Sequence, residues 1–126
     1  WMAQKGCFLK LGPEDIQSII FYDWIRFKKL DHITHHVANE RKANPASGDI
    51  LKRKGVKAGV LDYFIMRASK GYHGLIIELK VKPNKPSPFQ LQYIKDMNAE
   101  GYYALVCWSA EEAKQVVCDY LMISST

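Results

Sequence analysis

The sequence predicts one α/β domain, a mixed β-sheet flanked by helices in the order α-β-β-β-α-β-α. The first observation is that three apolar runs, at residues 59–66, 75–81 and 102–108, have the length and flanking residues of short buried strands. The second is that apolar residues recur at helical spacing near both ends of the chain. The third is a helix start between the last two runs, which predicts a parallel, right-handed crossover between those strands.

The length and composition fit a globular protein. The 126 residues are enough for one domain, which we expect to span residues 1–126 with residues 1–12 as a tail. No apolar run approaches the roughly 20 residues that cross a bilayer, and there is no signal-peptide pattern, so no membrane partner is expected.

The chain has three cysteines, Cys7, Cys107 and Cys118, without metal-ligand spacing. The last two lie in apolar runs and are expected to be buried free thiols. This fits a reducing compartment, so we expect a cytoplasmic protein.

The first helix is predicted to open at Gly12-Pro13-Glu14 and to run to about Leu30. Pro suits a first helical turn, and an acid there complements the positive end of the helix dipole. Apolar residues recur along it at helical spacing, at Ile16, Ile19, Ile20, Trp24 and Phe27. Glu14 therefore has a structural interpretation as a first-turn charge, beside the functional one given below.

Residues 32–38 are expected to form a strand that carries three histidines, His32, His35 and His36. They lack the spacing of a zinc motif and have no Cys nearby, so a structural zinc site is not expected. Histidines that face solvent or phosphates are the preferred interpretation.

A long polar connection follows, at residues 39–54, and its last part, residues 49–54, is expected to form a short helix. A connection this long in a small domain is often functional. Gly55 and Gly59 come after it and are expected to allow unusual backbone angles or a close approach to a ligand.

Charges interrupt two of the apolar strands. Asp62 lies in the run at residues 59–66, and Glu78 and Lys80 lie in the run at residues 75–81. Because side chains alternate along a strand, Glu78 and Lys80 should share a face. Two acids and a lysine that converge indicate a site for a divalent cation, with Asp62 and Glu78 as oxygen ligands for Mg²⁺ or Mn²⁺. Lys80 would orient the attacking water or stabilise phosphate charge. The alternative is two amphipathic edge strands with solvated charges.

The net charge of +5 allows a nucleic-acid partner. One basic cluster precedes the strand of Asp62 and another follows the strand of Glu78. Their members are Lys52, Arg53, Lys54 and Lys57, and Lys82 and Lys85. Because both clusters border the same acids, we expect phosphate contacts. The alternative is two solvated loops.

Two capping boxes mark the helices of the second half. The first, Ser87-Pro88-Phe89-Gln90, predicts a helix to about residue 99. Gln90 has two interpretations: it is the capping partner of Ser87, or it reaches the water or a phosphate, because this helix opens beside the strand of Glu78. The second box, at residues 109–112, starts a helix to about residue 122. Its inner face is expected to carry Ala113, Val116, Val117 and Tyr120.

Three stretches together resemble the VRR-NUC family of the PD-(D/E)xK nuclease superfamily. They are Gly55-Val-Lys-Ala-Gly59-Val-Leu-Asp62, Gly74-Leu-Ile-Ile-Glu78-Leu-Lys80 and Ser87-Pro-Phe-Gln90. The resemblance covers about residues 14–121. Leu61 stands where the family usually has Pro, whereas the carboxylate of Asp62 is retained.

The resemblance implies a restriction-endonuclease-like fold and a Mg²⁺- or Mn²⁺-dependent endonuclease that hydrolyses phosphodiester bonds in DNA. It implies a homodimer that acts on branched DNA such as four-way (Holliday) junctions. Substrate contact is expected at Asn39 and Arg41. The implied site residues are Asp62, Glu78, Lys80, Gln90, Glu14 and the backbone carbonyl of Leu79, with the two strand acids, Glu14 and that carbonyl as metal ligands.

Two other classes of function remain as alternatives. A non-catalytic nucleic-acid-binding module would use the same basic clusters, but it would predict a broken acid set, and here the set is intact. A structural protein–protein module leaves three charges in apolar strands unexplained. Loss of cleavage with retained DNA binding in Asp62→Ala would separate catalysis from binding.

Overall fold

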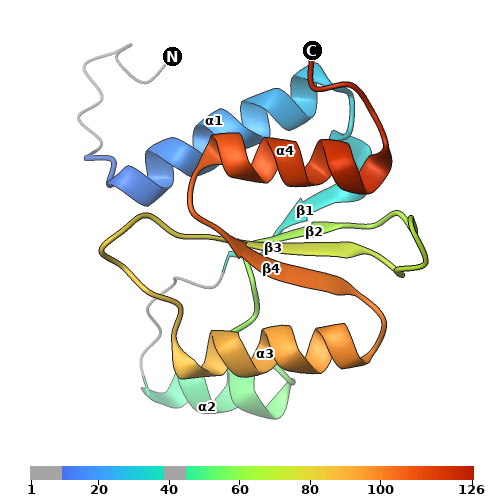
Figure 1. The fold of residues 1–126 in the computed structure, drawn as a ribbon. Helices are drawn as coiled ribbons and strands as arrows, with labels where there is room; N and C mark the ends of the chain where they lie inside the picture. The colour runs from blue at the N-terminus through green and yellow to red at the C-terminus, as the bar shows by residue number, and fades with distance from the viewer. Residues whose placement is uncertain (1–9, 39–44) are drawn as a thin grey trace.

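The structure is a computed structural model that describes residues 10–38 and 45–126. A four-stranded sheet lies between helices on both of its faces (Figure 1). The elements in chain order are α1 (Pro13–Phe27), the 3-10 turn η2 (Asp31–Ile33), β1 (Thr34–His36), α2 (Pro45–Arg53), β2 (Tyr63–Ile65), β3 (Leu75–Leu79), α3 (Pro88–Ala99), β4 (Tyr103–Cys107) and α4 (Ala110–Leu121). The predicted order is confirmed, with α2 as the helix of the long connection. This helix begins four residues earlier than expected.

The sheet is mixed, with the strand order β1-β2-β3-β4. Strand β2 is antiparallel to both of its neighbours, β1 and β3, whereas β3 and β4 are parallel. The parallel pair is joined by α3, as the sequence predicts. The strands are shorter than the apolar runs, so Asp62 directly precedes β2 and Lys80 directly follows β3. Because β2 and β3 run in opposite directions, these two ends meet at one edge of the sheet.

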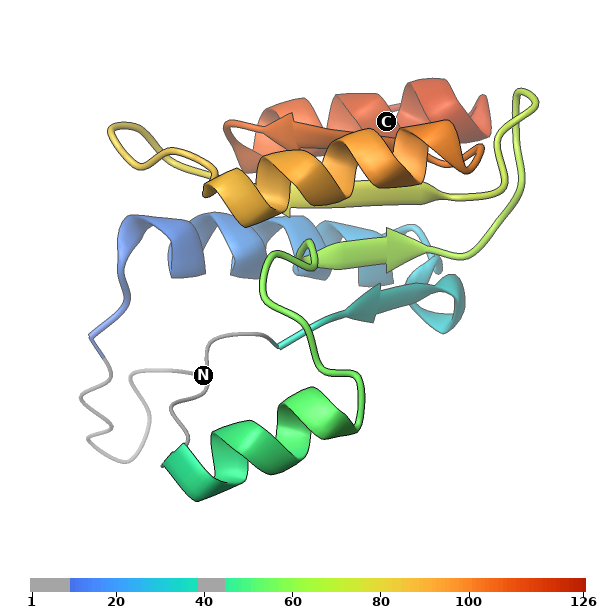
Figure 2. The ribbon, with the colours of Figure 1, turned by 90° about the horizontal axis from the view of Figure 1, so that it is seen from below.

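Helices α1 and α4 cover one face of the sheet, and α3 covers the other. Helix α2 lies on the same side as α3 but beyond the β1 edge of the sheet (Figures 1 and 2). The larger core cluster, under α1 and α4, contains Ile77 and Leu79, whereas the smaller one contains Ile76. This alternation along β3 directs Glu78 toward the side of α3.

The buried face of α1 is not the face that the helical spacing of its apolar residues indicated. Phe21 and Ile25 are fully buried, whereas Ile16, Ile20 and Phe27 are 44%, 41% and 75% exposed. Apolar residues occur almost all round this helix, so their spacing predicts a helix without selecting one face. Packing selects it: the ring of Phe21 meets the ring of Tyr63 edge-on, 5.0 Å between centroids.

The last helix follows the sequence closely. Ala113, Val117 and Tyr120 are buried, and Val116 is partly buried against the same core. Cys107 and Cys118 are free and buried, as predicted, whereas Cys7 and the tail up to residue 9 lie outside the described residues. Among the helices of the described residues, none has both the length and the apolar character needed to cross a membrane.

Candidate active site

Glu78 is a buried carboxylate near the C-terminal end of β3, with 2% of its surface exposed. Its Oε2 accepts a hydrogen bond from Nε2 of Gln90 at 3.0 Å and lies 3.5 Å from Nζ of Lys80. Its Oε1 is buried and has no hydrogen-bond partner among the described residues. Buried polar atoms are nearly always paired, so this oxygen needs an explanation.

Asp62 lies at the adjoining strand end. Tyr63 is opposite Ile77 in the antiparallel pair, so the same register, continued by one step, places Asp62 opposite Glu78. Oδ2 of Asp62 accepts a hydrogen bond from the backbone N–H of Leu79 at 2.9 Å. The backbone carbonyl of Asp62 accepts another from the N–H of Val37 at 2.7 Å. These two bonds hold Asp62 between β1 and β3.

Both carboxyl groups have raised pKa values, and burial is the main cause for each. Burial, and after it the charge of Asp62, raise the pKa of Glu78 from 4.5 to about 7, against the lowering effect of Lys80. Burial also raises the pKa of Asp62, against the hydrogen bond from Leu79 and the charges of His36 and Lys80. Both shifts have the sign expected for acids brought together away from water. A proton or a bound cation would offset the cost of holding two ionised carboxylates here.

Lys80 stands between two acids. Its Nζ lies 3.5 Å from Oε2 of Glu78 and 4.0 Å from Oε1 of Glu14, on the first turn of α1. Oε2 of Glu14 also accepts a hydrogen bond from Nδ2 of Asn84 at 2.9 Å. Glu14 therefore reaches the neighbourhood of Glu78 through Lys80, in addition to its favourable place near the helix N-terminus.

Gln90 combines both interpretations that the sequence allows. Its Oε1 accepts from the backbone N–H of Ser87 at 2.8 Å, and its backbone N–H donates to Oγ of Ser87 at 3.1 Å, which completes the capping box. Its Nε2 then donates to Glu78. One amide thus starts α3 and orients the buried carboxylate.

Gly59 allows the loop before Asp62 to pass against the first turn of α3. Its φ is +89°, and a Cβ at this position would lie 2.6 Å from the backbone carbonyl carbon of Phe89. The unusual backbone angle is therefore confirmed, and the close approach that the structure shows is to the helix that carries Gln90 and not to a ligand. The loop of Asp62 and the helix of Gln90 are locked together here.

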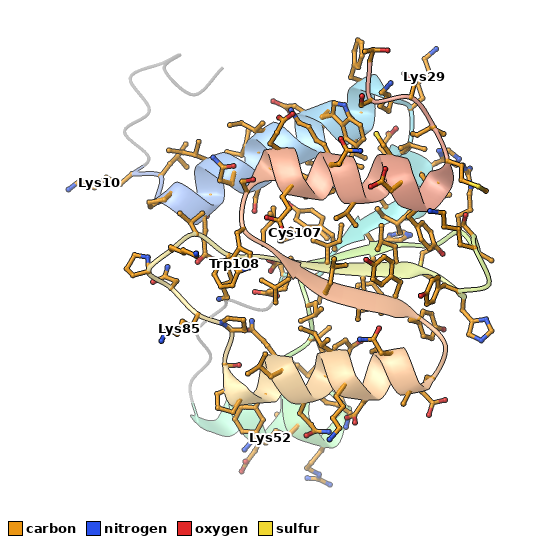
Figure 3. The ribbon with its side chains drawn as sticks, in the orientation of Figure 1. Lys10, Lys29, Lys52, Lys85, Cys107 and Trp108 are labelled. Carbon is orange, nitrogen blue, oxygen red and sulfur yellow. The ribbon has the colours of Figure 1, made fainter. Side chains whose placement is uncertain are left out.

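The predicted basic residues are exposed. Lys82 and Lys85 lie in the loop after Lys80, and Lys52, Arg53, Lys54 and Lys57 lie on and after α2. Lys82 places Nζ over the ring of Trp108, 5.7 Å from its centroid. Figure 3 shows Lys85 and Trp108 at the end of the molecule where β3 and β4 end. Asn39 and Arg41 lie outside the described residues.

The donor set at this edge fits Mg²⁺ in one particular way. No three His, Cys, Asp or Glu side chains of the described residues are grouped closely enough to hold a metal ion among themselves. Mg²⁺ is commonly bound by one or two carboxylates, with waters and substrate phosphates as the remaining ligands. Asp62 and the unpaired Oε1 of Glu78 supply such a pair. Glu14, which bonds Asn84, is the less direct candidate ligand.

Two contributors were not predicted from the sequence. Asn84 holds Glu14 across 70 positions of chain, and Trp108 lies beneath Lys82. Asn84 lies in a segment with the composition of an ordinary turn, and Trp108 ends an apolar run. No local signal distinguishes either of them.

Comparisons with known proteins bear on this arrangement. No protein-family model matches the chain, and a search of curated proteins gives no match. Among solved structures, the chain is similar to one described as a "VRR_NUC domain protein", at 30% sequence identity and a TM-score of 0.76. The similarity covers 92% of this chain and 93% of that chain.

Proposed function

The chain belongs to the VRR-NUC family of nucleases, and from this premise we propose that it is a metal-dependent endonuclease that hydrolyses phosphodiester bonds in DNA. One observation carries the proposal. Glu78 is a buried carboxylate whose Oε1 has no hydrogen-bond partner in the described part of the chain, and Asp62 is fixed beside it. Two carboxylates close together and away from water destabilise the folded chain, and a bound cation would offset that cost.

Asp62 and Glu78 are the proposed ligands for Mg²⁺ or Mn²⁺, with the backbone carbonyl of Leu79 and with Glu14 as further candidates. When bound, the cation would lower the pKa of a water and offset the negative charge of the reacting phosphate. The chain's own contribution is to present two ionised oxygens at one point. The hydrogen bonds from Leu79 to Oδ2 of Asp62 and from Gln90 to Oε2 of Glu78 orient the two carboxylates before substrate arrives.

Lys80 is the proposed catalytic cation. Its ammonium is anchored between Glu78 and Glu14, so it can donate to a phosphate oxygen or to the attacking water without a large search of rotamers. Gln90 is the proposed positioning residue for Glu78. Because its amide already belongs to the capping box of α3, its orientation is fixed by a second hydrogen bond.

The exposed lysines and arginine that precede the strand of Asp62 and follow the strand of Glu78 support DNA as the substrate, since each can neutralise a backbone phosphate. Branched DNA, including four-way junctions, and a homodimer are finer proposals that rest on the family resemblance. The exposed Ile16, Ile20 and Phe27 of α1 provide an apolar surface that a second copy could bury. Sedimentation at several protein concentrations would measure the oligomeric state.

The test is a cleavage panel of duplex, flap, single-stranded and four-way-junction DNA with Mg²⁺ or with EDTA. We expect cleavage with Mg²⁺ only, and its loss in Asp62→Asn and Glu78→Gln. Glu100→Gln, at an exposed position after α3, is the matched control and should cleave normally. DNA binding without cleavage in every case would instead indicate a non-catalytic binding module.

A further inference from the structure

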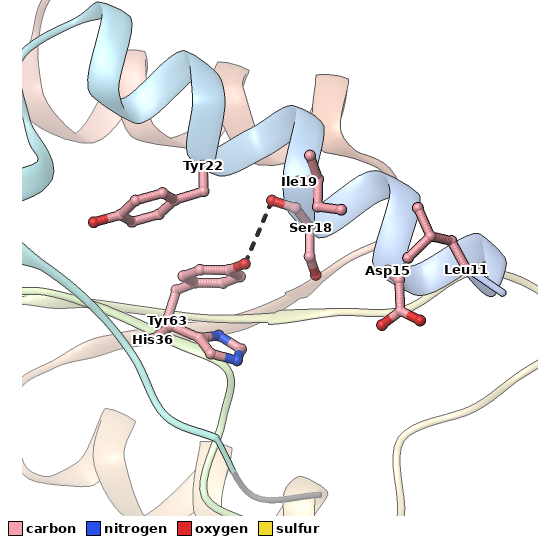
Figure 4. Close-up of a pocket in the computed structure, with 7 residues that line it drawn as sticks. All are labelled: Leu11, Asp15, Ser18, Ile19, Tyr22, His36 and Tyr63. Atoms are coloured by element: carbon pink, nitrogen blue, oxygen red, sulfur yellow. Dashed lines mark hydrogen bonds between the residues drawn. The ribbon is translucent and has the colours of Figure 1, made fainter. Parts of the chain in front are cut away.

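A pocket of about 380 Å³ opens between α1 and the β1–β2 side of the sheet, and no role proposed above uses it. Its walls include Asp15, Ser18, Ile19 and Tyr22 from α1 and His36 and Tyr63 from the strands (Figure 4). Its volume lies in the range of small-molecule sites, about 300–1,000 Å³. We propose that this pocket binds one unpaired base of the DNA strand that is cleaved.

The aromatic walls suit a flat ring. Tyr63 is almost fully buried, and its hydroxyl donates to the backbone carbonyl of Ser18 at 3.4 Å. The ring of Tyr22 lies nearly parallel to it, 19° between planes and 6.4 Å between centroids, and the ring of His36 lies 4.8 Å from it on a tilted plane. Tyr63 therefore forms the floor of the pocket, and the more exposed rings of Tyr22 and His36 offer the faces on which a base can stack. Such stacking accepts any base, because every base has an aromatic face.

The charge of the pocket favours a base over a phosphate. Asp15 is an acid on its wall, and its Oδ2 is held by the backbone N–H of Gly12 at 3.2 Å. A carboxylate repels a phosphate but accepts hydrogen bonds from the amino groups of bases. Lys10 lies just before Leu11, which also lines the pocket, and Figure 3 shows it at the same end of the molecule as Lys85. The phosphates of the strand can thus contact lysines outside the pocket, while the base lies inside it.

The pocket and the candidate active site lie at one end of the sheet but on its two opposite faces. Tyr63 directly follows Asp62, so their side chains point to opposite faces, and Asp15 directly follows Glu14. His36 pairs with Tyr63 in the sheet, and the next residue, Val37, donates to the carbonyl of Asp62. A strand whose phosphate lies at Asp62 would therefore reach the pocket by passing round the end of the sheet at His36 and Val37. This step depends on the proposed function.

A base that enters this pocket cannot also be paired. The pocket therefore selects DNA with an unpaired nucleotide beside the cleaved bond, such as a single strand, a flap or the opened centre of a branch, over continuous duplex. Extrusion of a base costs least where it is already unpaired, so the selection needs no reading of sequence.

Binding of a short single-stranded oligonucleotide, measured by fluorescence anisotropy in EDTA, tests the proposal without catalysis. A set of oligonucleotides carries one abasic site, moved position by position. For the unmodified protein we expect one position at which loss of the base weakens binding about 5- to 100-fold, the scale of one aromatic stack.

Two variants test where that base is held. Ser18→Phe fills the pocket and keeps the backbone carbonyl that Tyr63 uses, and Tyr22→Ala removes one aromatic wall. Both should weaken binding of the intact oligonucleotide and abolish the dependence on the abasic position. Tyr72→Ala, which removes a tyrosine ring in the loop between β2 and β3 and outside the pocket, should keep both, and thermal melting reports whether each variant folds.

An abasic scan without any sensitive position would overturn the pocket. So would a scan whose sensitive position persists in both folded pocket variants. Cleavage of the same oligonucleotides with Mg²⁺ is measured separately. Cleavage with a flat scan counts against the pocket alone, whereas a pocket-dependent scan without cleavage supports the pocket and counts against the nuclease proposal.

Discussion

Replacement of Glu78 by Gln should change how the stability of the metal-free protein depends on pH. The substitution removes the charge and keeps an oxygen that can accept from Nε2 of Gln90. Lys80 loses one partner but still faces Glu14 at 4.0 Å. The variant therefore isolates the energetic cost of an ionised carboxylate at this position.

The magnitude follows from the pKa. In the folded chain Glu78 holds its proton up to a pKa of about 7, whereas the unfolded chain releases it near 4.5. The folded state thus binds more protons between these values, and the free energy of unfolding falls as pH rises through them. The total loss is about 3 kcal/mol, fully present above pH 7 and absent below pH 4.5. The raised pKa of Asp62 acts in the same direction.

The assay is urea unfolding in EDTA, followed by tryptophan fluorescence at several pH values between 4.5 and 8. The quantity compared is the unfolding free energy of Glu78→Gln minus that of the unmodified chain. It should rise by about 3 kcal/mol across this range. If the new amide of the variant lacks a hydrogen-bond partner, the variant loses stability by the same amount at every pH. This loss does not affect how the difference between the two proteins changes with pH.

Glu100→Gln is the control, because this exposed position lies after α3 and away from the site. Its difference from the unmodified chain should vary little with pH. Parallel pH profiles for Glu78→Gln and the unmodified chain would refute the reasoning. Glu78 would then be solvated or already neutralised, and the main support for a cation site would be lost.

Three further predictions concern the groups around this carboxylate. Lys80→Arg and Lys80→Ala should each lower the rate of single-turnover cleavage by on the order of 10²-fold, while DNA binding at fixed salt changes little, because a planar guanidinium does not replace a compact ammonium in a tight site. Near-normal cleavage by the Arg variant would mean that Lys80 only balances the charge of the carboxylates. Gly59→Ala should lower the free energy of unfolding by about 1–3 kcal/mol, because the φ of +89° strains any residue with a Cβ and that Cβ would clash with α3. Its control, Gly48→Ala, lies within α2 with open space around it and should raise the free energy of unfolding by about 0.5–1 kcal/mol. Equal changes for the two variants in urea unfolding would contradict this. Asn84→Ala should lower cleavage about 10-fold without a change in melting temperature, since the contact is exposed, and unchanged cleavage would separate Glu14 from the site.

The sequence by itself determined the features that depend on neighbouring residues. The capping box of Ser87 and Gln90 is a contact between positions three apart, so its pattern predicts both the start of α3 and its geometry. The alternation along β3 likewise predicts that Glu78 and Lys80 share a face, and in the structure Nζ of Lys80 lies 3.5 Å from Oε2 of Glu78. Charges in apolar strands are anomalous wherever they occur, so Asp62 and Glu78 stand out before any fold is known.

Tertiary structure alone decided the features that join distant positions. The face of α1 that is buried, the bond from Asn84 to Glu14 and the pocket beside Tyr63 each depend on how α1 is placed on the sheet. Apolar residues surround α1, so several rotations of the helix bury similar areas, and periodicity cannot choose between them. The choice rests on the fit of Phe21 against Tyr63, an interaction between side chains 42 positions apart in the chain that no local pattern encodes.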